Sequence, residues 1–274
     1  MHRVLIAILL TASVCDVSLA DRFAADQHRN AAQLTRFAVG SHRSAANISR
    51  NPSRHPVETL MFFGIQPDMT VVEISPGGGG WYTEILAPFL RNRGTYYAGS
   101  YDPESEREYY RRNAVRYTDK LAEYSQHYDR VNVGIFAPPE QTDTVAEGSA
   151  DMVLTFRNSH NWMRDGVGQQ AYNAVSRMLK PGGVLGVVQH RAKAGSKVDP
   201  SKGYITEEKI IAMAETAGLR LVASSEVNAN PNDTADHPEG VWTLPPGLRL
   251  KDQDREKYIA IGESDRMTLK FVKD

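Results

Sequence analysis

A carboxylate and a run of glycines follow one short apolar stretch, and together they are typical of a ligand-binding loop. The stretch is Thr70–Ile74, interrupted by Glu73, and Ser75 and Pro76 lead from it into four glycines, Gly77–Gly80. Glycine has no Cβ, so a ligand can contact the backbone directly at these positions. The carboxylate of Glu73 can orient such a loop or bind a cationic group of the ligand.

The neighbouring sequence predicts the elements that hold this loop. A short apolar run at 71–74 is typical of a strand that is covered on both faces. After the glycines, apolar side chains between Tyr82 and Leu90 recur at the spacing of one helix face. Pro88 lies inside this helix and should kink or shorten it, because its ring removes a donor and crowds the preceding turn. The loop therefore brings bare backbone to the N-terminus of a helix.

Two common nucleotide-binding patterns do not fit this loop. The dinucleotide fingerprint Gly-x-Gly-x-x-Gly requires a third glycine, but Tyr82 or Thr83 occupies that position. The phosphate loop requires Gly-Lys-Ser/Thr, which does not follow here. What remains is an acid, Glu73, followed by Gly77 and Gly79. A tight turn that binds no ligand is the alternative interpretation.

A second polar run, Arg157–Trp162, comes directly after the strand predicted at Asp151–Phe156. Ligands of open α/β sheets bind outside the carboxyl ends of the strands, so this run should lie in the same crevice as the glycine loop. The turn Lys180–Gly183 leads into a fifth strand, Val184–Val188, and His190 stands just past its end. The candidate catalytic residues are Arg157, Asn158, His160 and His190.

The rest of the chain alternates strands and helices. Strands are predicted at 94–100, 130–136, 219–224 and at the C-terminus, and helices at 103–126, 167–179 and 207–217. The C-terminal strand alternates Met267, Leu269 and Phe271 with other side chains, which predicts an antiparallel strand with one more solvated side. Before it, Glu226–Ser264 is long for a plain connection and predicts a lid or a substrate-binding insertion.

Composition narrows the class of protein. The chain has 274 residues, of which 41% are hydrophobic and 24% charged, as in globular α/β proteins. Its formal net charge of −1 gives no electrostatic reason to expect nucleic acid or an anionic membrane as a partner. The segment Asp21–His55 is polar and rich in arginine. It is interpreted either as a helical arm packed on the main domain, residues 56–274, or as a solvated leader.

Met1–Ala20 has the pattern of a cleavable export signal. Arg3 supplies a positive start, Val4–Leu10 is apolar, and small residues precede Asp21. The apolar run is too short to span a bilayer comfortably; an uncleaved anchor or a buried helix is the alternative. Cleavage after Ala20 would remove the only cysteine and leave no disulfide or cysteine-bound metal. We therefore expect a periplasmic or secreted protein without a transmembrane anchor.

The loop also resembles motif I of the class I S-adenosylmethionine (SAM) dependent methyltransferases, acid-x-Gly-x-Gly-x-Gly, with Ser75 in place of the first glycine. Leu-Lys-Pro-Gly-Gly before the fifth strand resembles a junction of the same superfamily, and the element order matches from Pro56 to Lys273. Four longer stretches resemble a secreted bacterial branch of these enzymes: EISPGGGGWYTEILAP, LTFRNSHNW, HPEGVWTLPP and ESDRMTLKF.

This resemblance implies a Rossmann-like α/β fold, with strands in the order 3-2-1-4-5-7-6, strand 7 antiparallel, and helices on both faces. It also implies SAM as the cofactor. Asp102, at the end of the second strand, would bind the ribose, because a carboxylate accepts two hydrogen bonds at once. A cap for the following helix is the alternative role of Asp102. The implied cofactor-binding residues are Glu73, Ser75, Pro76, Gly77, Gly78, Gly79 and Asp102.

The first functional hypothesis is methyl transfer to a small molecule or an exported acceptor. SAM carries its own activated methyl group, so the protein must chiefly align the acceptor. His160 is the first choice for a base or an acceptor-orienting group and His190 the second, because imidazole titrates near neutral pH. Arg157 suits a carboxylate or phosphate of the acceptor. Asn158 suits a positioning role, and Trp162 suits an apolar wall.

The residues after the fourth strand also bear on the acceptor. The Asn/Asp-Pro-Pro-Tyr tetrad of many amino-methylating enzymes is absent there, which argues against a nucleic acid or an amide nitrogen as the acceptor. The insertion that carries His237 and Trp242 would close over the crevice.

Two other hypotheses belong to different classes. A non-catalytic ligand-binding protein on the same fold would explain Ser75 in the glycine motif, and an exported chain meets little obvious supply of SAM. A metal-dependent hydrolase would use His160, His190 and His237. These histidines show no tight ligand spacing, so we expect no metal.

Overall fold

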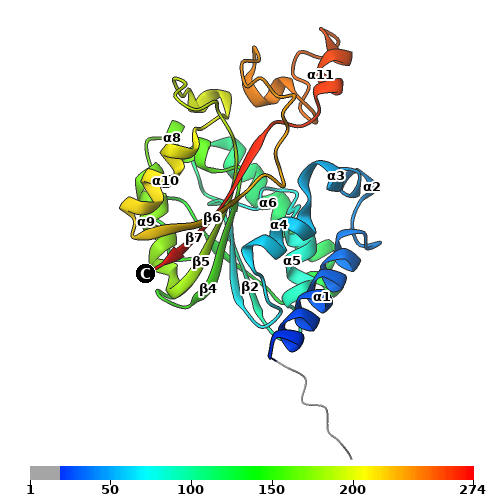
Figure 1. Ribbon diagram of the computed structural model, residues 1–274, viewed down its shortest axis with the longest axis vertical. Coiled ribbons are helices and arrows are strands. Elements are labelled where there is room, and N and C mark those ends of the chain that lie inside the picture. Colours follow the sequence, from blue (N-terminus) through cyan, green and yellow to red (C-terminus); the bar gives the residue numbers. More distant parts are fainter. Residues whose placement is uncertain (1–18) are drawn as a thin grey trace, which may run out of the picture.

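A seven-stranded sheet runs through the computed structural model, which describes residues 19–274 (Figure 1). The spatial order is β3-β2-β1-β4-β5-β7-β6, and β7 runs antiparallel to both of its neighbours. The predicted strand order and directions are thus confirmed. The strands are β1 (Thr70–Ile74), β2 (Thr95–Ser100), β3 (Val131–Ile135), β4 (Ala150–Phe156), β5 (Leu179–His190), β6 (Leu219–Ser225) and β7 (Arg266–Lys273).

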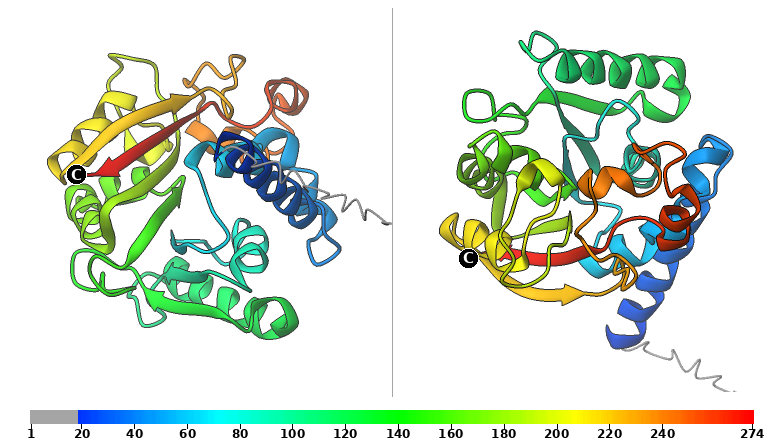
Figure 2. Two further views of the ribbon diagram at one scale, coloured as in Figure 1. Left: turned by 60° about the horizontal axis from the view of Figure 1, so that its bottom comes forward. Right: turned by 90° about the horizontal axis from the view of Figure 1, so that it is seen from above.

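Helices cover both faces of this sheet (Figure 2). On one face, helices from the N-terminal half pack against Leu154, and on the other face later helices pack against its neighbour Val153. The central strands are buried on both sides, which explains their continuous apolar sequence. The helices are α1 (Leu19–Ala38), α2 (Ala45–Ile48), α3 (Asn51–Arg54), α4 (Pro56–Phe63), α5 (Thr83–Leu90), α6 (Glu108–Glu123), α7 (Ser125–Tyr128), α8 (Ser159–Arg164), α9 (Gly168–Met178), α10 (Glu207–Thr216) and α11 (Arg255–Ile261).

The connection between β1 and α5 carries the glycine loop. Pro88 lies inside α5, and the helix ends two residues later at Leu90, so it has only eight residues. This agrees with the predicted shortening. The loop leaves β1 at the carboxyl edge of the sheet, beside the end of β4, which pairs with β1 in parallel register.

The segment before the sheet is helical and packs on the core. In α1, Leu34 and Ala38 are buried together with side chains of α4 and α5. Arg43 donates from Nε to Glu84 Oε2 over 2.8 Å, and both side chains are almost fully buried. Asn47 donates to the other oxygen of Glu84 at 2.9 Å. Removing one partner of a buried ion pair is costly, so this pair holds the segment on α5. Of the predicted export signal, Leu19 and Ala20 begin α1, and residues 1–18 lie outside the described part of the chain.

Two predicted boundaries are wrong. The helix predicted at 103–126 begins only at Glu108, because Asp102 Oδ1 accepts the N–H of Glu104 in a separate turn, and the helix breaks at Tyr124. Asp102 therefore does not cap α6. The fifth strand is longer than predicted, since the segment assigned to a turn already belongs to β5, which pairs with β4 from Leu179 onward through a register shift.

The prediction of one more solvated side for the C-terminal strand is only partly right. Met267, Leu269 and Phe271 are buried as expected, but Arg266 and Thr268 on the other side are buried as well. Arg266 donates to the carbonyl of Ser53, so the segment before α4 covers the start of β7.

The insertion 226–264 lies beyond the carboxyl ends of the parallel strands (Figure 1). It contains a 3-10 turn, Gly240–Thr243, and helix α11. Asp233 fixes it to the sheet, because its Oδ2 accepts the N–H of Asp265 and its carboxylate accepts the hydroxyl of Tyr204. No helix in residues 19–274 is long and apolar enough to cross a membrane.

Candidate active site

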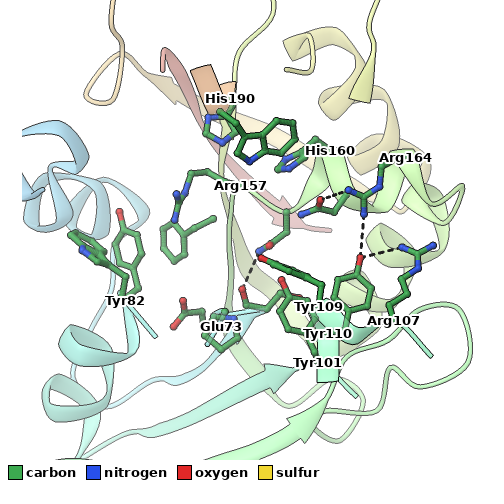
Figure 3. A pocket seen from close by; sticks show the side chains of 18 of the residues that line it. Glu73, Tyr82, Tyr101, Arg107, Tyr109, Tyr110, Arg157, His160, Arg164 and His190 are labelled. Carbon is green, nitrogen blue, oxygen red and sulfur yellow. Dashed lines mark hydrogen bonds between the residues drawn. The ribbon is translucent and has the colours of Figure 1, made fainter. Parts of the chain in front are cut away.

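A cavity of about 410 Å³ opens at the carboxyl ends of β1, β4 and β5 (Figure 3). It brings together most of the residues that the sequence singled out, although they come from separate parts of the chain. The predicted site residues that line it are Glu73, Ser75, Pro76, Gly77, Arg157, Asn158, His160 and His190. Gly78, Gly79 and Asp102 are not among its lining residues.

The first three glycines of the loop have different roles. Gly77 has φ +70°, and a Cβ there would meet no atom within 4 Å, so its Cα borders open space on the cavity side. Gly78 and Gly79 instead contact α6 through their backbone polar groups. The N–H of Gly78 donates to Asn113 Oδ1 at 3.1 Å, and Lys120 Nζ donates to the carbonyl of Gly79. The loop thus offers one glycine to a ligand and uses the next two to dock on a helix.

Ser75, where the resemblance expects a glycine, has a left-handed backbone with φ +51°. Such a conformation is uncommon for a residue other than glycine. The N–H of Ser75 donates to the carbonyl of Gly99 at 2.8 Å, which ties the turn to the end of β2. Serine therefore fulfils the backbone role of the missing glycine, and its hydroxyl oxygen is buried.

Glu73 is buried below the loop. Its Oε2 accepts hydrogen bonds from the hydroxyls of Tyr96 and Thr83. Burial raises the pKa of Glu73 to about 7, although these hydrogen bonds oppose the shift. Its Oε1 makes no hydrogen bond to the described residues and is available to a cationic group in the cavity.

Asp102 lines a second cavity of about 450 Å³ at the ends of β2 and β3. The two cavities adjoin, because Ser75, Tyr101, Arg107 and Tyr110 line both. Asp102 Oδ2 has one long contact of 3.4 Å, from Gln141 Nε2, and retains acceptor capacity. The structure therefore separates the glycine loop and Asp102 into neighbouring compartments that share one wall.

Asn158 joins β4 to the glycine loop. Its Nδ2 donates to the carbonyl of Ile74 at 2.9 Å and to Thr155 Oγ1 at 3.2 Å. The side-chain amide is thus committed to protein groups, while its oxygen remains on the cavity wall. Asn158 holds the turn at the end of β1 in place.

His160 lies at the start of α8, and its ring nitrogen Nδ1 is 3.3 Å from Gln189 Nε2. The Gln189 amide nitrogen also donates to the carbonyl of Gly203 at 2.9 Å, so it must be the donor to His160 as well. A neutral His160 ring that accepts at Nδ1 carries its proton on Nε2. Burial lowers the pKa of His160 to about 4, so the ring is neutral at physiological pH.

His190, the last residue of β5, lies beside His160, with ring centroids 5.7 Å apart. Its Nδ1 is 2.5 Å from Ser264 Oγ, at the end of the insertion. Burial and the neighbouring His160 hold the pKa of His190 well below its usual range. Both histidines are therefore neutral hydrogen-bonding groups on one side of the cavity.

Arg157, which follows β4 directly, has φ +65° and donates its N–H to the carbonyl of Val188 at 2.7 Å. Burial and repulsion from Arg266 lower the pKa of Arg157 to about 10, so it remains protonated at neutral pH. Its guanidinium has no carboxylate within 4 Å in the described chain.

Several lining residues escaped the sequence analysis. Arg107, Tyr109 and Tyr110 come from the start of α6, and Arg249 comes from the insertion. These residues gave no signal, because single arginines and tyrosines are common on helix and loop surfaces.

The remaining predicted groups divide between cavity and core. Trp242 lines the cavity and lies over His160, with ring centroids 5.8 Å apart. His237 does not line it, because its Nε2 contacts Asp233 Oδ1 at 2.9 Å. Trp162 lines the Asp102 cavity and packs in the core against Tyr172. Within residues 19–274, no three His, Cys, Asp or Glu side chains group closely enough to hold a metal ion.

Comparison with known proteins gives a likeness of fold. No family model matches the chain, and no curated protein matches it. A SAM dependent methyltransferase from Aquifex aeolicus superposes with a TM-score of 0.55 at 16% identity, over 82% of this chain and 93% of the other. The 4+2 cyclase SpnF gives a TM-score of 0.55 at 14% identity, over 91% and 94%.

A third similar structure contains the cofactor. Phosphoethanolamine N-methyltransferase 2 of Haemonchus contortus, in complex with S-adenosyl-L-methionine, gives a TM-score of 0.54 at 16% identity, over 94% of this chain and 60% of the other. At such low identities the likeness concerns the fold alone. The chain thus has the seven-stranded, Rossmann-like fold of the class I SAM-dependent methyltransferases.

Proposed function

We propose that this protein is a SAM-dependent methyltransferase that acts on a small-molecule acceptor. The observation that carries the proposal is the pair of adjoining cavities, in which Glu73 is the one acid that lines the first and Asp102 is among the acids that line the second. Glu73 lies at the end of β1 in the first cavity and Asp102 beyond the end of β2 in the second. Acidic groups at these two points suit a ligand with an ammonium at one end and a ribose at the other.

The residues present fit this cofactor. Gly77 leaves space where any side chain would enter the cavity, Glu73 Oε1 lacks a partner in the described chain, and Asp102 Oδ2 keeps acceptor capacity. Glu73 would bind the ammonium, Asp102 the ribose hydroxyls, and the end of β3 at Phe136 and Ala137 the adenine, since both line the Asp102 cavity. When bound, SAM supplies an activated methyl group.

The protein's own contribution is alignment of the acceptor. The neutral His160 can donate a hydrogen bond from Nε2 to an acceptor atom, and its low pKa makes it a weak base. Asn158 holds the end of β1, so the glycine loop keeps its position. Trp242, from the insertion, makes an edge contact with the ring of His160, which supports a lid role for this segment.

The test is calorimetric titration of the protein with SAM and with its demethylated product, S-adenosylhomocysteine (SAH). Binding of both at micromolar affinity, followed by transfer of labelled methyl to an acceptor, is the expected result. Binding without any transfer would favour the second candidate, a ligand-binding protein on this fold. The cyclase SpnF shares the fold, so fold alone does not decide between methyl transfer and another activity.

We also propose that the protein is exported, to the periplasm or beyond the cell. The charged start, the apolar run and the small residues before Asp21 support this. N-terminal sequencing of protein from the periplasmic fraction should begin at Asp21, one residue after Ala20 in the first turn of α1. An intact Met1 in a purely cytosolic fraction would contradict the proposal.

A further inference from the structure

The cavity beside the glycine loop is strongly basic. Four arginines line it, and Glu73 is the one acid among its lining residues. The arginines come from three distant parts of the chain, so their meeting is a product of the fold: Arg107, Arg157, Arg164 and Arg249.

Two of these arginines share one carboxylate of the protein, that of Asp165. Arg164 Nε lies 3.0 Å from Asp165 Oδ1, and Arg107 pairs with the other oxygen of the same carboxylate. The other two are not neutralised. Arg157 has no carboxylate within 4 Å in the described chain, and the exposed Arg249 only stacks on Trp242, with 4.5 Å from its guanidinium carbon to the ring centroid.

The surroundings of Arg157 add to the positive charge. Arg50, Arg54 and Arg266 gather near it, and all three share the single carboxylate of Glu263, at 2.7, 3.5 and 3.2 Å. Arg54 and Arg266 are almost fully buried. One acid cannot offset four arginines, so this end of the cavity holds positive charge at a free-energy cost.

A SAM molecule does not offset this charge. Its sulfonium and ammonium outweigh its one carboxylate, so it brings a net positive charge into a basic cavity. The missing negative charge must come from the other substrate. A guanidinium also offers a planar fork of donors that suits a carboxylate or a phosphate.

We propose that the methyl acceptor is an oxyanion, a small carboxylate or phosphate that binds to Arg157 and is covered by Arg249 of the insertion. This inference rests on the proposed function, whose acceptor it specifies. Arg157 points to the side of Tyr82, away from Arg107, Tyr110 and the wall shared with the Asp102 cavity (Figure 3). The oxyanion therefore occupies the end of the cavity opposite the ribose.

The acceptor also meets apolar walls. Tyr82 and Phe156 stack with ring centroids 3.6 Å apart, and Trp242 of the insertion lines the same cavity. Aromatic side chains give area for an apolar body, and the neutral His160 and His190 place donors near it. An aromatic or otherwise apolar acid fits this lining better than a fully polar anion.

The experiment titrates benzoate and inorganic phosphate into the protein saturated with SAH. Benzoate should bind the parent protein, and Arg157→Met should weaken it by at least about tenfold, because hydrogen bonds to a charged group are lost. Arg249→Gln should weaken it about threefold to tenfold. Arg255→Gln is the matched control, since Arg255 lies in the same insertion, is exposed, and has no ion pair in the described chain; it should leave benzoate binding unchanged. Phosphate in place of benzoate distinguishes the two oxyanion classes.

Thermal unfolding without ligand separates a ligand-binding role from a structural one. Arg157→Met should melt at the same temperature as the parent or higher, because it removes an unneutralised charge. Benzoate should raise the melting temperature of the parent and not that of the variant. A fall of several degrees for ligand-free Arg157→Met would show that Arg157 is a structural residue and overturn the proposal.

Other outcomes also decide the matter. If neither anion binds the SAH complex, or if both bind Arg157→Met as tightly as the parent, the acceptor is not held by Arg157. If Arg157→Met weakens SAH binding and leaves anion binding unchanged, the arginine serves the cofactor's own carboxylate, and the proposal falls. If SAH fails to bind while benzoate binds through Arg157, the oxyanion site stands and methyl transfer is refuted.

Discussion

The two halves of the cavity differ in how far the protein itself satisfies their polar and charged groups. On the side of β1 and β2, the glycine loop is fixed by hydrogen bonds to α6 and β2, and Glu73 is buried beneath it. On the side of β4 and β5, Arg157 lacks a neutralising partner and two histidines are held neutral. The loop of the first half is held in place by hydrogen bonds within the protein, whereas the second half has a positive charge that no carboxylate within 4 Å neutralises in the described chain.

This difference indicates which half of the cavity selects the acceptor. The glycine loop is held by hydrogen bonds within the protein, so it presents the same shape to every ligand. Such a loop suits a cofactor, which stays the same whatever the acceptor is. A half with unneutralised charge discriminates between acceptors, because an acceptor without the matching group leaves the charge buried and unpaired. Substitutions in the first half should therefore change cofactor binding, and substitutions in the second should change the choice of acceptor.

Among the substitutions that test this difference between the two halves, the largest effect is expected at Gly77. Gly77→Val should weaken SAH binding by at least about a hundredfold, because a β-branched residue is strained at φ +70° and its side chain enters the cavity. Calorimetric titration measures it. Gly79→Ala is the control, since a Cβ there meets open space at an ordinary φ, and it should bind SAH like the parent. Equal losses in both variants would mean that the loop as a whole, and not the cavity edge, governs binding.

Glu73→Gln should change how the free energy of unfolding depends on pH. The carboxyl should lose its proton near pH 4.5 in the unfolded chain and only at a pKa of about 7 in the folded protein. The folded state binds the extra proton in this window, so the parent loses stability as the pH rises through it. The variant does not titrate and should gain about 3 kcal/mol relative to the parent between pH 4.5 and 8. Urea unfolding at several pH values measures it, and a pH-independent difference would refute the buried, protonated carboxyl.

Asp102→Ala should have a smaller effect. Loss of a carboxylate that accepts two ribose hydroxyls should weaken SAH binding by about tenfold to a hundredfold. Adenine alone should bind the variant as it binds the parent, because it lacks the ribose. Asp119→Ala is a suitable control, since Asp119 is exposed on α6 and remote from both cavities. Unchanged SAH affinity in Asp102→Ala would move the ribose site elsewhere.

The smallest effect is expected at His160. As a hydrogen-bond donor it should lose about tenfold in turnover when replaced by glutamine, with SAH affinity intact. A general base would lose roughly 10²–10⁴-fold. With a pKa of about 4, the parent's turnover should not change through His160 titration between pH 6 and 8. A steep rise with an apparent pKa near 6.5 would restore His160 as the base.

Local sequence determined the elements around the glycine loop. The apolar run at 71–74, the glycines and the helix face from Tyr82 to Leu90 depend on short-range propensities and periodicity. For that reason β1 and α5 agree with prediction to within a residue. The strand order also followed from the sequence, although through resemblance to a known fold and not from periodicity.

Tertiary structure alone decided the chemistry within those elements. The sequence treated Gly77 and Gly79 alike, but only the structure shows that Gly77 lines the cavity and that the Gly79 carbonyl contacts Lys120 of α6. His160 was a candidate base until Gln189, remote in sequence, fixed its tautomer. Periodicity describes which face of an element is buried, but it contains no information on the partner across the fold.

The arginines at the basic end of the cavity show the same limit of prediction from local sequence. Arg54, Arg157 and Arg266 come from three separate segments, and each is an ordinary arginine when read singly. The fold gathers them around one acid, Glu263, and burial turns their summed charge into a requirement for an anion. Electrostatic interactions depend on distance and on desolvation, and neither quantity is encoded in local sequence.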